Sequence, residues 1–181
     1  MPDEMLVEII LYLNARERVM LGNSCTRFKR LVFEEKRLLR YLDFSSDGYL
    51  TSLSDVQQYF NHRNKYDQIR KINVSNIYCT KPSQMLQYIG KAKNLIDVNI
   101  TGFTFKDVKQ MASFLKPLEQ LKKLSIDWPT APMNNTLCCQ ILEGPFKALT
   151  HLTMMLYDIK YGWTLIHVLE LCQELEELCL L

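Results

Sequence analysis

This sequence of 181 residues has no marked excess of charge of either sign, since it contains 22 Lys and Arg and 20 Asp and Glu. No run of Lys and Arg is longer than two residues. Binding to nucleic acid depends mainly on clustered positive charge, so we expect no nucleic-acid partner. No apolar stretch approaches the roughly 20 residues that a bilayer-spanning helix needs. The apolar start Met5–Leu13 contains Glu8 and has no basic leader, so we expect neither a membrane anchor nor a secretory signal.

Catalytic and metal-binding motifs are also missing. The chain has no P-loop, no G-x-G-x-x-G, no H-E-x-x-H and no nucleophile elbow. Its three histidines, His62, His151 and His167, are scattered, and none has metal-ligand spacing to a cysteine. We therefore expect a non-catalytic protein without catalytic residues, bound metal or cofactor.

Paired cysteines of the C-x-x-C type are absent, although the chain has six cysteines. The adjacent pair Cys138-Cys139 cannot easily form a disulfide. We expect reduced and mostly buried thiols in a cytoplasmic or nuclear protein. The six residues are Cys25, Cys79, Cys138, Cys139, Cys172 and Cys179.

What the sequence does contain is a repeat. The pattern apolar-x-x-apolar-x-apolar occurs six times, as in Leu121-Leu124-Ile126, with starts 30, 26, 26, 28 and 26 residues apart. A period of this length, with a short strand in each unit and room for a helix between strands, is typical of a leucine-rich-repeat solenoid. The six matches begin at Leu39, Ile69, Leu95, Leu121, Leu149 and Leu175.

The segments between these strands predict one amphipathic helix per repeat. We expect an α/β fold over residues 45–181, with parallel strands inside and helices outside. Thr104-x-x-Asp107 predicts a capping box, and Ser54 predicts a helix cap. The last strand pattern has no capping segment after it, so we expect further repeats beyond Leu181. The helical apolar residues are Met85, Leu86 and Ile89, then Val108, Met111, Ala112 and Leu115, then Leu137, Ile141 and Leu142, then Leu165, Ile166, Leu169 and Leu171.

The alternation of side chains along each strand predicts what the inner surface presents. The apolar positions point into the core, and the third, fifth and seventh positions face the concave side. This surface is polar and carries charges of both signs, which fits either a solvated face or recognition of a protein substrate. Trp128 and the loop after it are a separate candidate contact, the alternative being an exposed packing residue. The candidate contacts on the strands are Lys71, Asn73, Asp97, Asn99, Lys123, Ser125, Asp127, His151, Thr153 and Glu177, with Ser75 facing the same side.

Residues 1–44 do not follow the repeat and predict a module of three short helices. The first has an apolar face that ends at Asn14-Ala15, and Met5 and Tyr12 widen that face. A second helical pattern runs from Arg16 to about Phe33, and a third from Glu35 to Leu42. From the pattern alone, this module is either a cap for the solenoid or a docking site for another protein.

The module resembles an F-box. The resemblance rests on Met1-Pro2-Asp3-Glu4-Met5-Leu6-x-x-Ile9-x-x-Tyr12-Leu13, followed by Ser24-Cys25-x-x-Phe28-x-x-Leu31. Met1, Ser24 and Leu39 depart from the usual residues of that family, but none places a charge in the expected interface. An F-box followed by leucine-rich repeats is the architecture of a recurrent subfamily of F-box proteins.

The resemblance implies docking to a Skp-family adaptor, which links F-box proteins to cullin and RING subunits of a ubiquitin ligase. This chain would then be the substrate receptor, acting in proteasomal degradation. The alternative is a repeat-only interaction scaffold whose N-terminal helices are a solenoid cap. The adaptor contacts that the resemblance implies are Pro2, Leu6, Ile9, Leu13, Cys25, Phe28 and Leu31.

Overall fold

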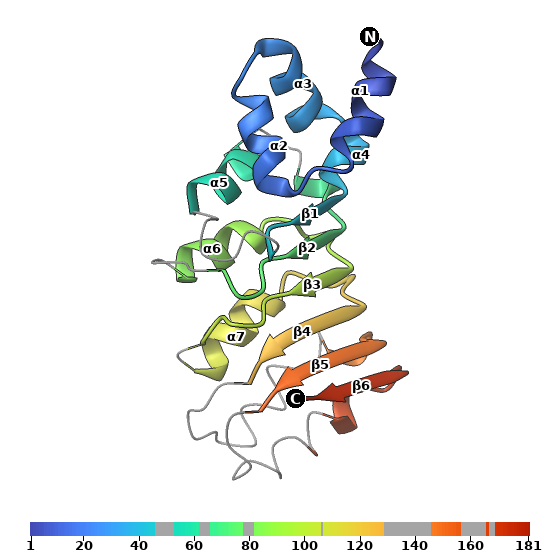
Figure 1. Ribbon diagram of the computed structural model, residues 1–181. Coiled ribbons are helices and arrows are strands. Elements are labelled where there is room, and N and C mark those ends of the chain that lie inside the picture. Colours follow the sequence, from blue (N-terminus) through green and yellow to red (C-terminus); the bar gives the residue numbers. More distant parts are fainter. Residues whose placement is uncertain are drawn as a thin grey trace.

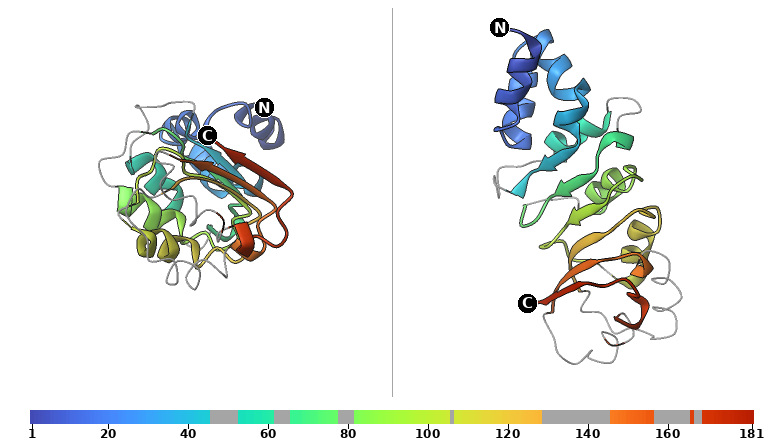
Figure 2. Two further views of the ribbon diagram at one scale, coloured as in Figure 1. Left: turned by 90° about the horizontal axis from the view of Figure 1, so that it is seen from below. Right: turned by 90° about the vertical axis from the view of Figure 1, so that its right-hand side faces the viewer.

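A helical module stands at one end of an elongated stack of parallel strands in the computed structural model (Figures 1 and 2). The structure describes residues 1–45, 53–61, 66–77, 82–105, 107–128, 146–156, 166 and 169–181. The chain begins in the helical module and ends at the last strand of the stack (Figure 1). The predicted α/β class is confirmed.

The helical module contains four helices where the sequence predicted three. They are α1 (Asp3–Ile10), α2 (Ala15–Gly22), α3 (Thr26–Glu34) and α4 (Lys36–Leu39). Asn14 begins α2 instead of ending α1, because its side chain and that of Glu17 form a reciprocal capping box.

The single helix predicted from Arg16 to Phe33 is wrong, because the chain is extended at Cys25. Gly22 at the end of α2 allows the returning α3 to pack closely. A Cβ atom at Gly22 would lie 2.8 Å from the Phe33 ring.

The strands form one six-stranded parallel sheet in sequence order, β1 to β6. Their pairing joins equivalent positions of the repeat, so that Lys71, Asp97 and Lys123 lie side by side. The strands are β1 (Tyr41–Asp43), β2 (Lys71–Asn73), β3 (Asp97–Asn99), β4 (Lys123–Asp127), β5 (His151–Met155) and β6 (Glu177–Leu180).

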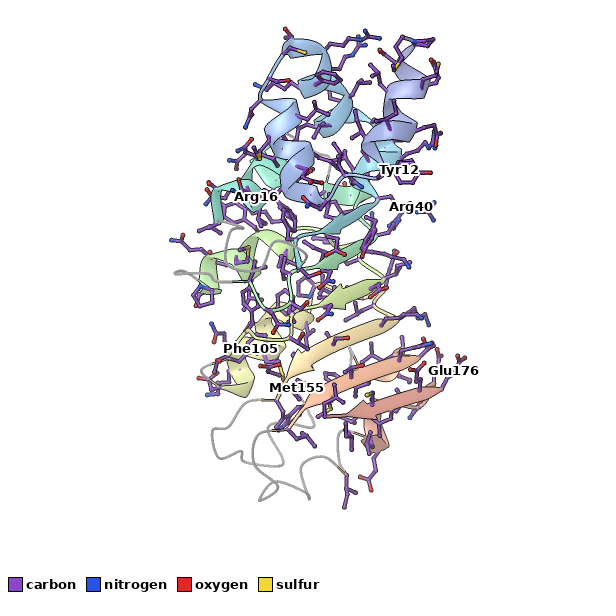
Figure 3. The ribbon with its side chains drawn as sticks, viewed as in Figure 1. Tyr12, Arg16, Arg40, Phe105, Met155 and Glu176 are labelled. Carbon is purple, nitrogen blue, oxygen red and sulfur yellow. The ribbon has the colours of Figure 1, made fainter. Side chains whose placement is uncertain are left out.

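One backbone pattern fixes the spacing of the strands. The carbonyl of Arg40 accepts hydrogen bonds from the N–H groups of both Arg70 and Lys71. The same double contact recurs at every later step of the sheet, and Arg40 and Glu176 mark the two ends of this edge (Figure 3). Each strand start is therefore tied to the preceding repeat, and the register cannot slip by one residue without losing both bonds. The later carbonyls are those of Arg70, Ile96, Lys122 and Thr150.

Helices pack along one side of the sheet (Figure 2). They are α5 (Leu53–Asn61), the 3-10 helix η2 (Tyr66–Gln68), α6 (Pro82–Ile89) and α7 (Val108–Leu115). The predicted capping box at Thr104 is wrong. The cap of α7 is Asp107, whose carboxylate accepts the N–H of Gln110 at 2.8 Å. The predicted cap Ser54 lies inside α5.

Of the last two predicted helices, one lies outside the described residues and the other is described in part. The helix around Leu137, Ile141 and Leu142 lies outside the described residues, as does Leu165. Ile166 is exposed, and residues 169–171 are helical.

The apolar positions of the first five strand patterns form one continuous core with the inner faces of the helices. All fifteen of these side chains are at most 2% exposed, as in Ile72, Val98 and Leu124. Burial of one such side chain contributes about 1.5–3 kcal/mol, so repetition of this small unit supplies most of the stabilisation of the stack.

The sixth copy of the strand pattern, which begins at Leu175, differs from the other five. Leu178 and Leu180 of β6 are 39% and 43% exposed, because no other described element covers this strand.

A buried arginine joins the helical module to the sheet. Arg18 of α2 is 6% exposed, and its guanidinium donates five hydrogen bonds to backbone carbonyls at 2.9–3.2 Å. The acceptors come from the end of α1, the turn after it, α4 and β1, so one side chain ties together segments that are distant in sequence. Burial lowers the pKa of Arg18, but an arginine stays charged at neutral pH. The carbonyls belong to Ile10, Leu11, Leu13, Leu38 and Tyr41.

Tyr59 of α5 forms the second link at this junction. Its hydroxyl donates to the carbonyl of Ala15 at 2.8 Å, and its ring packs edge-on against Phe33 of α3 and Phe44 after β1. Burial raises the pKa of Tyr59, so the hydroxyl keeps its proton. The helical module and the sheet therefore share one core.

We predict that Arg18→Met lowers the free energy of unfolding by about 2–5 kcal/mol, because buried carbonyls lose their donors. Arg18→Lys should lose nearly as much, since an ammonium has only three donors on a single atom. Urea denaturation measures both changes. The control is Arg16→Met on the same helix, where we expect less than about 0.5 kcal/mol. An Arg18→Met protein as stable as wild type would mean that burial of the charge costs as much as its bonds contribute.

Candidate functional site

The first surface of interest is the outward side of α1. This helix has an acidic first turn, which suits its N-terminus, and it buries Val7 and Ile10. On its other side lie four large apolar residues that are between 52% and 91% exposed. Met5 and Ile9 lie one turn apart on the same face of α1, whereas Met1 precedes the helix and Tyr12 follows it. We call Met1, Met5, Ile9 and Tyr12 the α1 stripe; Tyr12 lies at the outside of the helical module (Figure 3).

The predicted adaptor contacts differ in how exposed their side chains are. Pro2, Ile9 and Cys25 are exposed, and Leu6, Leu13 and Phe28 are half-buried. Leu6 and Phe28 pack against the core, and Leu31 is part of it at 6% exposure. Leu31 therefore has little surface to offer a partner.

The sequence reasoning missed Met1, Met5 and Tyr12 as candidate contacts. Met5 and Tyr12 had widened the predicted apolar face of the first helix, and that width was the signal for an exposed surface.

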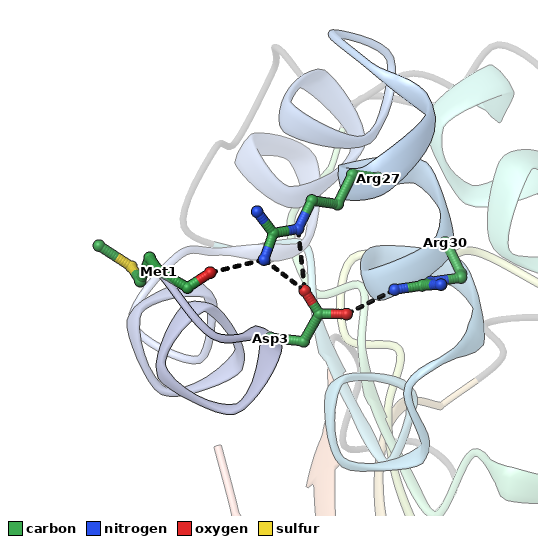
Figure 4. A network of polar contacts seen from close by, with 4 residues as sticks. All are labelled: Met1, Asp3, Arg27 and Arg30. Atoms are coloured by element: carbon green, nitrogen blue, oxygen red, sulfur yellow. Dashed lines mark hydrogen bonds and ion pairs between the residues drawn. The ribbon is translucent and has the colours of Figure 1, made fainter.

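Ion pairs hold the N-terminal end of α1 against α3 (Figure 4). Arg27 donates from Nε and Nη2 to Oδ1 of Asp3 at 2.9 and 2.6 Å, and from Nη2 to the carbonyl of Met1 at 2.6 Å. Arg30 contacts the other oxygen of Asp3, Oδ2, at 2.5 Å. We call Asp3, Arg27 and Arg30 the clasp. The hydrogen bond from Arg27 is the main cause that lowers the pKa of Asp3, so the carboxylate stays charged at neutral pH.

A groove of about 360 Å³ runs beneath the clasp. It lies between α1 on one side and α3 and α4 on the other. At its far end a second ion pair joins Glu8 of α1 to Arg37 of α4 at 2.6 Å. The groove is lined by Asp3, Glu4, Val7, Arg30, Leu31, Glu34, Glu35 and Arg37.

The second surface is the face of the sheet that the helices leave uncovered, which we call the open face. The third positions of the pattern form a row in which opposite charges meet. Lys71 pairs with Asp97 at 3.6 Å, and Nε2 of His151 lies 3.5 Å from Oε2 of Glu177, a contact that is an ion pair only when the histidine is protonated. Lys123 lies between these pairs and forms no ion pair with the described residues. The predicted adjacency of these charges is confirmed by the strand register.

The fifth positions of the first strands have a local structural role. The Oδ1 atoms of Asn73 and Asn99 accept the N–H of the residue two positions on, at 3.1 and 3.2 Å. Asp43 does the same for Ser45 at 2.9 Å. These contacts turn the chain after each strand, so the two asparagines have less capacity for a substrate. Ser125 and Thr153 continue the row and are half-buried.

Tyr41 and Asp43 close the open face beside the helical module. The hydroxyl of Tyr41 donates to Oδ2 of Asp43 at 2.7 Å. Burial raises the pKa of Tyr41 to about 12, and this hydrogen bond adds to the effect. Burial also pushes the pKa of Asp43 upward, but hydrogen bonds from Ser45 and Tyr41 outweigh it and the pKa lies below its usual value.

Three predicted substrate-side positions are not exposed. Asp127, Ser75 and Trp128 are 5%, 7% and 6% exposed. These residues lie at the end of a strand or just beyond it, and their side chains have little surface for a substrate. The loop that follows Trp128 lies outside the described residues.

Cysteine burial also differs from the expectation. Cys25 is exposed, Cys179 is half-buried and Cys172 is buried, which raises its pKa to about 11. Cys79, Cys138 and Cys139 lie outside the described residues. Within the described part of the chain, no group of three His, Cys, Asp or Glu is arranged to hold a metal, and no helix is long and apolar enough to cross a membrane.

Comparison with known families identifies the helical module. Residues 1–40 match the family model of the F-box domain, so the chain contains an F-box domain. F-box domains bind Skp-type adaptors in general, and proteins that contain them are typically non-catalytic subunits. The match ends before β1, whereas the predicted module extended to residue 44. No curated protein matches the chain.

We predict that substitutions at Leu31 and Ile9 differ in their effect on stability, because Leu31 is buried and Ile9 is exposed. Leu31→Ala should lower the free energy of unfolding by about 2–4 kcal/mol, because it leaves a cavity in the core. Ile9→Ala should change it by less than about 0.5 kcal/mol, since this side chain is 52% exposed. Urea denaturation of the two variants tests the assignment. Equal losses would contradict it.

Proposed function

We propose that this protein is the substrate-recognition subunit of a Skp–cullin–F-box type ubiquitin ligase. The observation that carries the proposal is the F-box match over residues 1–40 together with an exposed apolar stripe on the first helix of that domain. Apolar residues that lie together on a surface are typical of a protein interface. The α1 stripe and the exposed or half-buried predicted contacts would dock a Skp-family adaptor, and through it cullin and RING subunits.

We propose further that the sheet is a leucine-rich-repeat array. Six parallel strands in sequence order, a period of 26–30 residues and helices along one side support this interpretation. The open face would bind the protein substrate through exposed polar side chains such as Lys71, Lys123 and Glu177. The whole would act in the cytoplasm or nucleus, upstream of proteasomal degradation.

In this function the chain contributes proximity and performs no chemistry. Ubiquitin transfer depends on the substrate lying within reach of the catalytic subunits, and fixed geometry raises the effective concentration of the reacting groups. The shared core around Arg18 and Tyr59 supports such a fixed geometry, because docking surface and open face then belong to one rigid unit.

The second candidate function is a repeat scaffold in which the F-box helices only cap the array. The contacts that favour it are those of Tyr59 and Arg18, which bury one side of the helical module against β1 and α5. A cap, however, requires only that buried side. The α1 stripe is exposed and takes no part in those contacts, which favours the receptor.

We predict that Ile9→Asp abolishes co-purification with a co-expressed Skp-family adaptor in size-exclusion chromatography, because a charge would be buried in an apolar interface. The matched control is Ile166→Asp, which has similar exposure, 49% against 52%, but lies between β5 and β6 in the sequence and outside the F-box match. Both variants should keep the wild-type circular dichroism spectrum.

Two results would contradict the proposal. A folded wild-type protein that elutes without the adaptor would favour the scaffold. Equal adaptor binding by wild type and Ile9→Asp would remove the α1 stripe from the interface. Ile9 suits this test better than Phe28, which packs against the core and whose loss would also unfold the domain.

A further inference from the structure

The first turn of α1 is held mainly by charge. The buried residues of this helix, Val7 and Ile10, both lie in its second half. Met1, Pro2, Glu4 and Met5 are exposed, so the apolar packing of the first turn is limited to Leu6, which is half-buried against the core. The groove beneath Asp3 separates this turn from α3. The clasp bridges that gap.

The two ends of α1 are therefore fixed by different means. The second half is anchored by its buried side chains, by the Glu8–Arg37 pair and by Arg18, which binds the carbonyls at its end. At the first turn, Asp3 contacts two guanidinium groups from α3 and the Met1 carbonyl contacts one of them (Figure 4). Removal of the clasp should release only the first turn, since helix ends fray when their last anchoring contacts are lost.

We infer that Asp3, Arg27 and Arg30 are positioning residues for adaptor binding: they hold the first turn of α1 in the place where Met1, Pro2 and Met5 meet the adaptor. This inference rests on the proposed function and adds that residues outside the apolar interface set its affinity. The clasp holds this part of the stripe in place before the adaptor binds. Without the clasp, these residues would have to become ordered on binding, and that loss of entropy would lower the affinity for the adaptor.

The expected effect appears in affinity more than in stability. Exposed ion pairs change the free energy of unfolding by at most about 1 kcal/mol each, so the melting temperature should stay close to that of wild type. Adaptor affinity, measured by isothermal titration calorimetry on the full chain, should fall by about threefold to tenfold in Asp3→Asn. The paired variant Arg27→Met with Arg30→Met should fall by at least as much, since it also loses the Met1 contact.

Combining the substitutions distinguishes positioning from direct contact. If the arginines act through Asp3, the triple variant should bind as well as the paired arginine variant, because both lack the same clasp. If Arg27 and Arg30 instead bind the adaptor themselves, the losses from the aspartate and the arginines should multiply. That outcome would overturn the inference. The matched control is Arg37→Met, whose ion pair lies beside the anchored half of α1 and whose loss should leave the affinity unchanged.

A second measurement needs no adaptor and so separates this inference from the proposed function. In Asp3→Asn, the amide of Leu6, which donates to the Pro2 carbonyl in wild type, should exchange with solvent faster, while the Leu11 amide stays protected. Unchanged exchange at Leu6 would show that the clasp does not hold the turn. Faster exchange with no loss of adaptor affinity would show that it holds the turn without positioning the interface. Failure of the wild type to bind the adaptor would remove the proposed function and this inference with it.

Discussion

The guanidinium of Arg18 is the contact on which the arrangement of the two halves depends. Helices end with carbonyls that have no partner within the helix, and α1, α4 and the start of β1 bring several of these together in the interior. One planar cation with five donors satisfies them at once. A carboxylate partner would neutralise the charge, but it would not satisfy the carbonyls. The charge is therefore buried where backbone dipoles replace its hydration.

From that junction the sheet extends by repetition. Each strand after β1 begins with two N–H groups on one carbonyl of the preceding repeat, and in the first five patterns the same three apolar positions enter the core. Because the register is identical at each step, side chains of equal position form rows across the open face. The charge pairs Lys71–Asp97 and His151–Glu177 follow from this geometry. The repeat thus determines which side chains a partner would meet.

The parts of the structure that could be predicted from the sequence are those that recur with the repeat of 26–30 residues. The strands, their neighbours and the rows of charges follow from spacing alone, since one apolar pattern recurs at each step. The break between α2 and α3 could not be read, because Leu21, Cys25, Phe28 and Val32 continue one helical pattern through it. Arg18 looks like an ordinary charged helix residue until Leu38 and Tyr41 are brought beside it.

The candidate docking helix combines two kinds of anchoring with different consequences. At its second half, Arg18 and the apolar residues Val7 and Ile10 are buried, so solvent and salt have little access to what holds them. At its first turn the anchors are exposed ion pairs, which salt screens and which a single substitution removes. The α1 stripe spans both regions. Ile9 and Tyr12 therefore lie next to the anchored half of the helix, whereas the position of Met1 and Met5 depends on charges that lie outside the apolar surface.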